Sequence, residues 1–184
     1  MVLLESTNVP LGSSAPNFAN LPSVDGKQYQ LTDFADQQIL IVIFMCNHCP
    51  YVQAIIERLV SLQADYKDKN LQIIGINPND AVKYPDDSLE KMKEFAQEKN
   101  VNFIYVRDDS QEVAKAYKAQ CTPDIFVYNE NRALIYHGRL DDNWKDESQV
   151  TEQDLRSAID LYLNTKDVVE KQIPSMGCSI KWLS

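Results

Sequence analysis

The chain has 184 residues, of which 44% are hydrophobic and 24% are charged, and its formal charge at pH 7 is −9. These values are typical of one folded domain spanning 1–184, and an acidic chain without a block of Lys or Arg is not expected to bind nucleic acid or an anionic membrane surface. The sequence shows no secretory signal and no stretch of transmembrane length, so we expect a cytoplasmic protein with no membrane partner.

The predicted elements alternate between strands and helices. Residues 1–15 are expected to be an irregular lead-in, followed by a core over about 15–165 and a tail over 166–184. Further elements expected in chain order are a hairpin around 25–26, a helical turn at 32–33, a buried strand over 38–44, a helix over 49–68, a strand over 71–77, a surface loop over 78–87, a helix from 88, a strand over 103–106, a helix over 111–117, a hairpin of strands 124–128 and 133–137, and a helix opened by 151–154. The pattern predicts an α/β fold in which helices flank a central mixed sheet, with an N-terminal β-hairpin extension.

Two cysteines, Cys46 and Cys49, lie where the buried strand is expected to turn into the long helix. Unpaired N–H groups and the positive end of the dipole at a helix N-terminus favour a thiolate over a thiol. The spacing therefore predicts a reactive cysteine of low pKa with a neighbour able to close a disulfide. Two structural cysteines, or two ligands of a metal, are the alternative.

Several segments together carry a resemblance to a known family. The order of the elements resembles the layout of the thioredoxin fold. In that order, a strand is followed by Cys-x-x-Cys at the start of a helix, and Thr122-Pro123 then precedes an antiparallel hairpin. Four segments resemble the bacterial peroxiredoxin-like thioredoxin family, of the AhpC/TSA and TlpA branch. They are Cys-Asn-His-Cys-Pro-Tyr-Val, Cys-Thr-Pro-Asp, His-Gly-Arg-Leu-Asp-Asp and Gly-Cys-Ser-Ile-Lys-Trp. The resemblance extends from about residue 15 to residue 182.

The resemblance implies a role for each motif residue. Cys46 is expected to be the exposed nucleophile that attacks a substrate disulfide, and Cys49 the buried thiol that then releases the product. His48 is expected to stabilise the Cys46 thiolate, the alternative being an exposed histidine of little effect. Pro123 is expected to follow a cis peptide bond, which leaves the backbone of Thr122 free to pair with an extended substrate.

The other two cysteines each leave two interpretations open. Cys121 would be a third redox thiol or a metal ligand near the motif, or would merely pack as a small apolar residue. Cys178 would be a resolving thiol in a mobile tail, or would be buried if the tail docks on the body. We expect His137 and Trp144 to have structural roles.

Features of related enzymes are missing at the matching positions. Leu40 and Val52 stand where thioredoxins and TlpA-like reductases carry an acid, so the proton acceptor of the resolving thiol is His48, water or an acid elsewhere in the chain. The peroxiredoxin pattern Pro-x-x-x-Thr/Ser-x-x-Cys, counted back from Cys49, meets cysteine in place of the hydroxyl and valine in place of proline. Arg139 is the candidate cation of a peroxide site.

The leading hypothesis for function is a thiol–disulfide oxidoreductase that needs no cofactor. Its expected partners are protein or small-molecule disulfides and a cellular dithiol reductant. One alternative is a thiol peroxidase acting on peroxides, with Cys121 or Cys178 as resolving thiol. The other is a copper or zinc protein whose ligands are Cys46, Cys49, Cys121 and His48.

Overall fold

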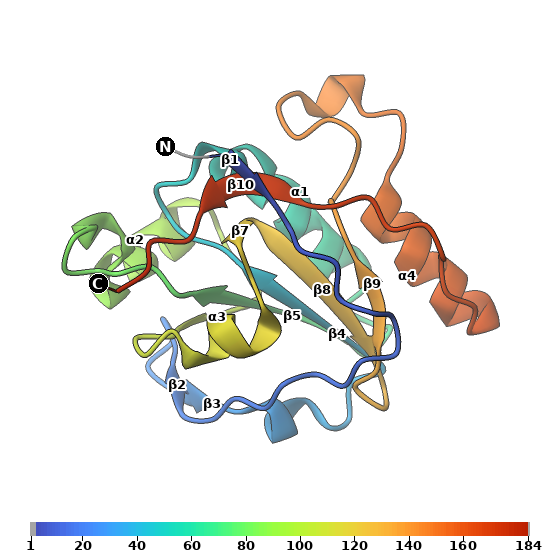
Figure 1. Ribbon diagram of the computed structural model, residues 1–184, viewed down its shortest axis with the longest axis horizontal. Coiled ribbons are helices and arrows are strands. Elements are labelled where there is room, and N and C mark those ends of the chain that lie inside the picture. Colours follow the sequence, from blue (N-terminus) through green and yellow to red (C-terminus); the bar gives the residue numbers. More distant parts are fainter. Residues whose placement is uncertain (1–2, 184) are drawn as a thin grey trace.

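The structure is a computed structural model that describes residues 3–183. Within this range, five strands form the central mixed sheet, in the order β6-β5-β4-β8-β9 (Figure 1). Strands β4, β5 and β6 run parallel, and β8 and β9 complete the sheet in antiparallel pairings. The bounds are β4 Ile39–Phe44, β5 Leu71–Asn77, β6 Ile104–Arg107, β8 Asp124–Asn129 and β9 Leu134–His137.

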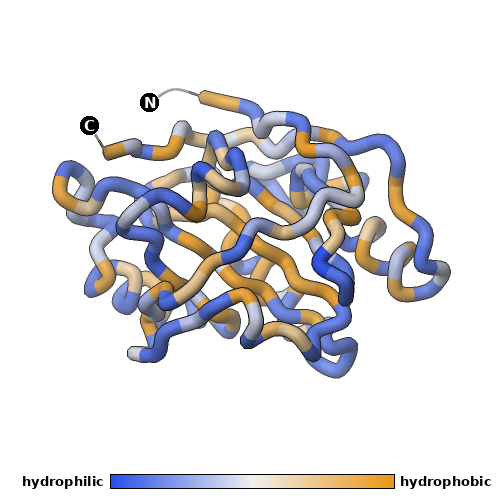
Figure 2. Tube along the Cα trace, turned by 60° about the horizontal axis from the view of Figure 1, so that its bottom comes forward, coloured by the Kyte–Doolittle hydropathy of each residue, from blue (hydrophilic) through white to orange (hydrophobic). Residues whose placement is uncertain are grey.

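Strand β4 lies at the centre of the sheet and is buried along its whole length. Ile39, Ile41 and Ile43 point into one hydrophobic core, and the residues between them point into the other, because successive side chains of a strand face opposite sides. This explains the unbroken apolar run in the sequence, and Figure 2 shows the hydrophobic stretches gathered in the inner strands.

Helices cover both faces of the sheet. Helices α1 (Pro50–Asp65), α2 (Leu89–Glu98) and α4 (Asp154–Thr165) contribute to the first core. Helix α3 (Glu112–Tyr117) and the N-terminal segment contribute to the second. In the described part of the chain, short 3-10 turns connect these elements: η1 (Leu31–Phe34), η2 (Pro85–Asp87) and η3 (Glu147–Gln149). The predicted thioredoxin-like α/β/α sandwich is confirmed.

The N-terminal hairpin extension is also confirmed. Strands β2 (Leu21–Pro22) and β3 (Gln28–Tyr29) pair in antiparallel fashion, and the turn between them contains Gly26 at a φ of +84°. Glycine adopts this left-handed conformation without steric cost, which is why the Asp-Gly pair marks the turn in the sequence.

Both ends of the chain depart from the prediction. Strand β1 (Leu3–Glu5) lies within the expected irregular lead-in, and strand β10 (Met176–Ser179) lies within the expected tail, for which no strand was predicted. They form a second sheet in the order β1-β10-β7, where β7 is Cys121–Thr122 (Figure 1). The prediction missed these strands because segments of two to four residues show no usable periodicity, and their pairing depends on distant parts of the chain. Among residues 3–183, no helix is long and apolar enough to cross a membrane.

Candidate active site

The cysteine motif occupies the loop between β4 and α1. Cys49 is the N-cap of α1 and Pro50 is its first residue, where a missing N–H costs nothing. Cys46 and Cys49 are both 0% exposed and belong to the first core together with Cys178. The expectation of an exposed Cys46 is therefore wrong, because the second sheet lies over the motif and buries it.

Cys49 has the environment that favours a thiolate. The pKa of its thiol is lowered to about 5, chiefly because the Cys46 thiol donates a hydrogen bond to it. Burial opposes this effect, and further donors from Cys178 and the backbone N–H of Val52 outweigh burial. The Cys49 sulfur lies 3.0 Å from Cys178 Sγ and 3.0 Å from the carbonyl oxygen of Thr122, to which the protonated thiol donates.

Cys46 has the opposite environment. Its pKa lies well above the ordinary value because its proton is shared with Cys49, because it is buried, and because the Asp87 carboxylate is close by. The thiolate was expected at Cys46, but this environment favours it at Cys49. The physical reason is position: Cys49, not Cys46, is at the helix N-terminus and receives the N–H of Val52.

His48 and Asp87 form an ion pair beside the motif. His48 Nδ1 lies 2.7 Å from Asp87 Oδ2, and the Tyr84 ring stacks on the imidazole with centroids 5.6 Å apart. The hydrogen bond and charge of Asp87 raise the pKa of His48 against the effect of partial burial. The His48 side chain is 22% exposed, so it is the part of the motif that reaches solvent.

Asp87 is buried and held by several donors. Its Oδ1 accepts the backbone N–H of Asn47 at 2.8 Å, and its Oδ2 accepts the side-chain amide of Asn79 at 2.8 Å. Burial by itself would raise the pKa of this carboxyl, but the bonds from His48, Asn79 and Asn47 lower it below its ordinary value.

Asp87 is a buried acid beside the motif, in a segment where the sequence analysis placed no site residue. The segment 78–87 was predicted to be a surface loop, which is wrong for Asn79, Asp80 and Asp87, all of them buried. The loop follows β5, and the carboxyl ends of parallel strands β4 and β5 meet at one edge of the sheet. A run of Asn and Asp at that edge, next to a motif at the end of β4, was a usable signal for the site.

The Thr122–Pro123 peptide bond is cis, as predicted. The Thr122 hydroxyl lies 3.4 Å from Cys46 Sγ. The backbone of Thr122 is not open, however, because it pairs with Cys178 of β10. The expectation of a free edge for an extended substrate is wrong in this structure, since the chain's own C-terminal strand occupies that edge.

The remaining candidate site residues, Cys121, Cys178 and Arg139, are not part of the Cys46–Cys49 pair. The Cys121 thiol donates to the carbonyl oxygen of Pro123 at 3.5 Å, and burial raises its pKa, which favours the packing interpretation. Cys178 is 1% exposed, so the docked-tail interpretation is correct. The side chain of Arg139 pairs with Asp154 at 2.8 Å and with Glu152, so it is already engaged by two acids.

His137 and Trp144 have the contacts of structural residues. His137 is buried, stacks on Phe126 and lies 2.8 Å from Asp124 Oδ1 through Nε2. Trp144 packs on Tyr51 at the start of α1, with ring centroids 4.1 Å apart. These contacts agree with the expectation that both residues support the fold.

The predicted metal ligands do not come together as a set. Within residues 3–183, the group whose ligand atoms converge consists of Cys46, His48 and Asp87, with all atoms within 4.8 Å of one another. Copper(I) prefers sulfur ligands, and only one of these three atoms is sulfur. Both carboxylate oxygens of Asp87 already accept protein hydrogen bonds, which fits the ion pair better than a metal centre.

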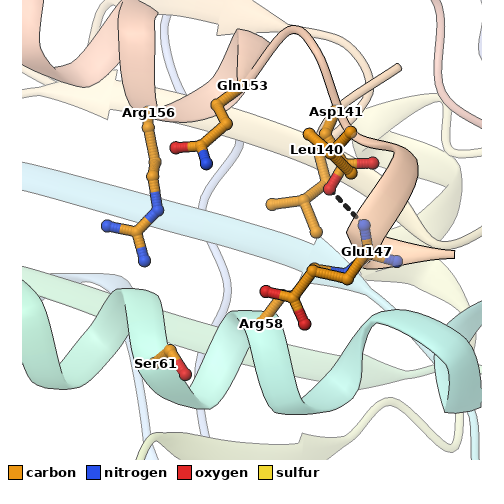
Figure 3. Close-up of a pocket in the computed structure, with 8 residues that line it drawn as sticks. Arg58, Ser61, Leu140, Asp141, Glu147, Gln153 and Arg156 are labelled. Atoms are coloured by element: carbon orange, nitrogen blue, oxygen red, sulfur yellow. Dashed lines mark hydrogen bonds and ion pairs between the residues drawn. The ribbon is translucent and has the colours of Figure 1, made fainter. Parts of the chain in front are cut away.

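Several pockets lie near these elements, among them one beside α1 and one beside His48. A pocket of about 330 Å³ between α1 and the loop before α4 contains no cysteine, and in it Arg58 pairs with Asp141 (Figure 3). A pocket of about 540 Å³ lies at the motif itself, and it is lined by His48, Lys83, Tyr84, Pro85, Asp86, Ser179 and Lys181. Of the motif residues, His48 is the one that lines the second pocket.

Residues 10–155 match the family model described as Redoxin. The chain belongs to the Redoxin family. This confirms the resemblance to the peroxiredoxin-like branch of the thioredoxin fold. The Redoxin-family chain is 27% identical over 106 residues to Peroxiredoxin Bcp of Escherichia coli K12, a match that covers 58% of this chain. The chain spans 62% of the length of the curated relatives it matches.

Solved structures extend the similarity to the whole chain. A conserved protein of Geobacillus kaustophilus is 44% identical with a TM-score of 0.93, covering 100% of this chain and 97% of that one. A protein of Sinorhizobium meliloti is 41% identical with a TM-score of 0.92, covering 98% of both chains. The fold is shared by the thioredoxin domain of a thiol-disulfide oxidoreductase from Bacteroides vulgatus. That domain is 21% identical with a TM-score of 0.61, covering 71% of this chain and 89% of that one.

Proposed function

We propose that this protein is a thiol–disulfide oxidoreductase that cycles Cys46 and Cys49 between dithiol and disulfide. The observation that carries the proposal is the hydrogen-bonded pair itself: a Cys49 thiolate with a pKa of about 5 at the N-terminus of α1, and a Cys46 thiol that shares its proton with it. Such a pair suits disulfide exchange, because the proton that the two sulfurs share can pass from Cys46 to Cys49 and free the Cys46 thiolate for attack, and the two sulfurs are within reach to close a disulfide.

His48 and Asp87 suit the first step. The sulfur of Cys46, a ring nitrogen of His48 and an oxygen of Asp87 all lie within 4.8 Å of one another. The Cys46 proton passes to Cys49 along their hydrogen bond, and the imidazolium of His48 stabilises the Cys46 thiolate that attacks the substrate disulfide. A sulfur–sulfur bond forms between Cys46 and the substrate, and the first substrate thiol leaves with a proton from His48.

The second step uses Cys49. Its sulfur gives up the proton it received and attacks Cys46 Sγ, the Cys46–substrate bond breaks, and the departing second substrate thiol takes up that proton. One substrate disulfide has become two thiols, and the protein holds a Cys46–Cys49 disulfide. A cellular dithiol then reduces this disulfide and restores the starting state. Thr122 and Pro123 border the reacting sulfurs in this scheme, and the pocket at His48 admits the substrate.

A disulfide-reduction assay with single variants tests this function. Cys46→Ser is expected to lose turnover of a model protein disulfide such as insulin, and circular dichroism should show the wild-type fold. Cys121→Ala is the matched control, because it removes a buried thiol whose contacts are with backbone carbonyls, and it is expected to retain turnover. Wild-type turnover in Cys46→Ser would contradict the proposal.

A second candidate function is a thiol peroxidase centred on Cys49. The observation in its favour is a low-pKa thiol at a helix N-cap with Cys178 Sγ at 3.0 Å. Cys49 would take one oxygen from a peroxide to become a sulfenic acid, and Cys178 would displace water to form a disulfide. The engaged side chain of Arg139 and the cysteine at the hydroxyl position count against it.

One equivalent of hydrogen peroxide separates the two functions. If the peroxidase is correct, reduced protein consumes the peroxide rapidly and a sulfenic acid on Cys49 is trapped by dimedone and located by mass spectrometry. The oxidoreductase is expected to oxidise slowly under the same conditions while exchanging readily with disulfides.

A further inference from the structure

Strand β10 occupies the place where the fold would receive an extended substrate. Cys178 is paired with Thr122 and Ser179 with Cys121 in an antiparallel register. The pairing continues one residue further, where the N–H of Ile180 donates to the carbonyl oxygen of Gln120 at 3.2 Å. Figure 1 shows β10 lying across the end of the central sheet beside β1. Adding a strand to an exposed edge is a common way in which a protein captures a peptide.

The register brings a thiol to the reactive pair. Cys178 Sγ lies 3.0 Å from Cys49 Sγ, within hydrogen-bond distance and close to the contact from which a disulfide is made. Gly177 makes this approach possible, because a Cβ at that position would overlap the carbonyl oxygen of Thr122. Sequence and register together therefore place a cysteine, and not another side chain, against Cys49.

We propose that β10 is a built-in substrate strand whose Cys178 exchanges disulfides with Cys49, so that the site operates as a relay of three cysteines. The proposal rests on the function proposed above, because the exchange starts from the Cys46–Cys49 disulfide. It assigns to Cys178 a catalytic role in passing the disulfide away from the motif.

The exchange needs no external oxidant. The Cys178 thiolate attacks Cys49 Sγ, a Cys49–Cys178 bond forms, and the Cys46–Cys49 bond breaks. Cys46 leaves as a thiolate and takes up the proton that Cys178 released, so the total number of thiols and disulfides is unchanged. The step restores a Cys46 thiol beside His48 while the protein remains oxidised.

The docked strand also limits what can reach the site. Contacts beyond β10 hold the segment down: the N–H of Lys181 donates to Asn79 Oδ1 at 2.8 Å, and the carbonyl oxygen of Lys181 accepts the side-chain amide of Gln111 at 2.8 Å. Asn79 also donates to Asp87, so the loop that supports His48 is the loop that anchors the strand. While β10 is docked, an extended protein segment cannot pair with Thr122, and a small disulfide is expected to approach from the pocket at His48.

Oxidised glutathione provides the test in a Cys46→Ser background. Cys49 is expected to attack glutathione disulfide and release one glutathione, and Cys178 then displaces the second and leaves an internal Cys49–Cys178 disulfide, identified by peptide mapping without reduction. Cys46→Ser combined with Cys178→Ser is expected to stop at the glutathione adduct. Cys46→Ser combined with Cys121→Ala is the matched control and should close the internal disulfide normally.

A substitution that pushes β10 away from Thr122 provides an independent test, through the rate at which the Cys49–Cys178 disulfide closes. Gly177→Ala in the Cys46→Ser background is expected to slow closure of the Cys49–Cys178 disulfide by about tenfold or more, because the effective concentration of the tethered thiol falls when the strand is pushed away. A Cys46→Ser protein that stops at the glutathione adduct, or that closes a disulfide to Cys121, would overturn the relay. If the wild-type protein still reduces insulin in that case, only the relay has failed; if the wild-type protein reduces no disulfide, the proposed function has failed as well.

Discussion

Replacing Asp87 by Asn should damage both the stability and the pH response of the site. Each carboxylate oxygen accepts a short hydrogen bond from a neutral donor: Oδ1 from the N–H of Asn47 and Oδ2 from the side-chain amide of Asn79, both at 2.8 Å. An amide has one acceptor oxygen and one donor nitrogen, so one of these buried donors would face another donor. An unsatisfied buried donor costs about 1–3 kcal/mol, and we expect the free energy of unfolding to fall by that amount.

The pH dependence of stability should change in a specific direction. His48 has a pKa raised above its ordinary value of 6.5, so the stability it contributes is complete below about pH 6.5 and is lost as the pH rises through the folded value. Asp87 has a pKa lowered below 3.8, so its contribution is present above about pH 4 and is lost as the pH falls through the folded value. The wild-type pair is therefore most stabilising between about pH 4 and pH 6.5, and the decline above that window should flatten in Asp87→Asn.

Urea unfolding at a series of pH values measures both effects. Asp86→Asn is the matched control, because Asp86 is the exposed neighbour in the same turn and offers only its backbone carbonyl to Asn47. Equal unfolding free energies and equal pH profiles for Asp87→Asn and Asp86→Asn would refute the assignment of Asp87 as the buried partner of His48.

Two further predictions concern other parts of the structure. The ultraviolet absorbance of the thiolate in the reduced protein should titrate with a midpoint of about pH 5, and Cys49→Ser should remove this transition; persistence of the transition would place the thiolate elsewhere. Arg58→Met should lower the free energy of unfolding by about 3–5 kcal/mol, because Asp141 would keep a buried charge without its partner and the carbonyl of Trp144 would lose a donor. A thermal midpoint equal to that of wild type would show that the Arg58–Asp141 pair contributes nothing.

Local patterns in the sequence predicted the central sheet and the position of the motif. The unbroken apolar run of 39–44 indicated a strand buried on both faces, and the strand-to-helix junction located Cys46 and Cys49. The Asp-Gly turn and the Ser88 cap also marked elements correctly, because each depends on the conformational preference of one or two residues. These features are local, and local physics is what a single sequence expresses most directly.

The site itself depended on long-range contacts that no local pattern contains. Asp87 lies 40 residues after Asn47, and Cys178 lies 129 residues after Cys49, yet both meet the motif. The expected thiolate at Cys46 differs from the structure, because the location of the thiolate depends on the hydrogen bond between the two cysteines, on which of them is the N-cap and on where the Asp87 charge lies. A charged loop residue is normally solvated, and only the folded structure shows that this one is enclosed.

The three-stranded sheet β1-β10-β7 has a consequence for biosynthesis. Its middle strand is the last strand to be made in the described part of the chain, whereas the motif and α1 are made early. Domains begin to organise from the N-terminal side while synthesis continues. During that interval Cys46 and Cys49 have no β10 above them, so a nascent chain exposes two reactive sulfurs that the finished protein keeps covered.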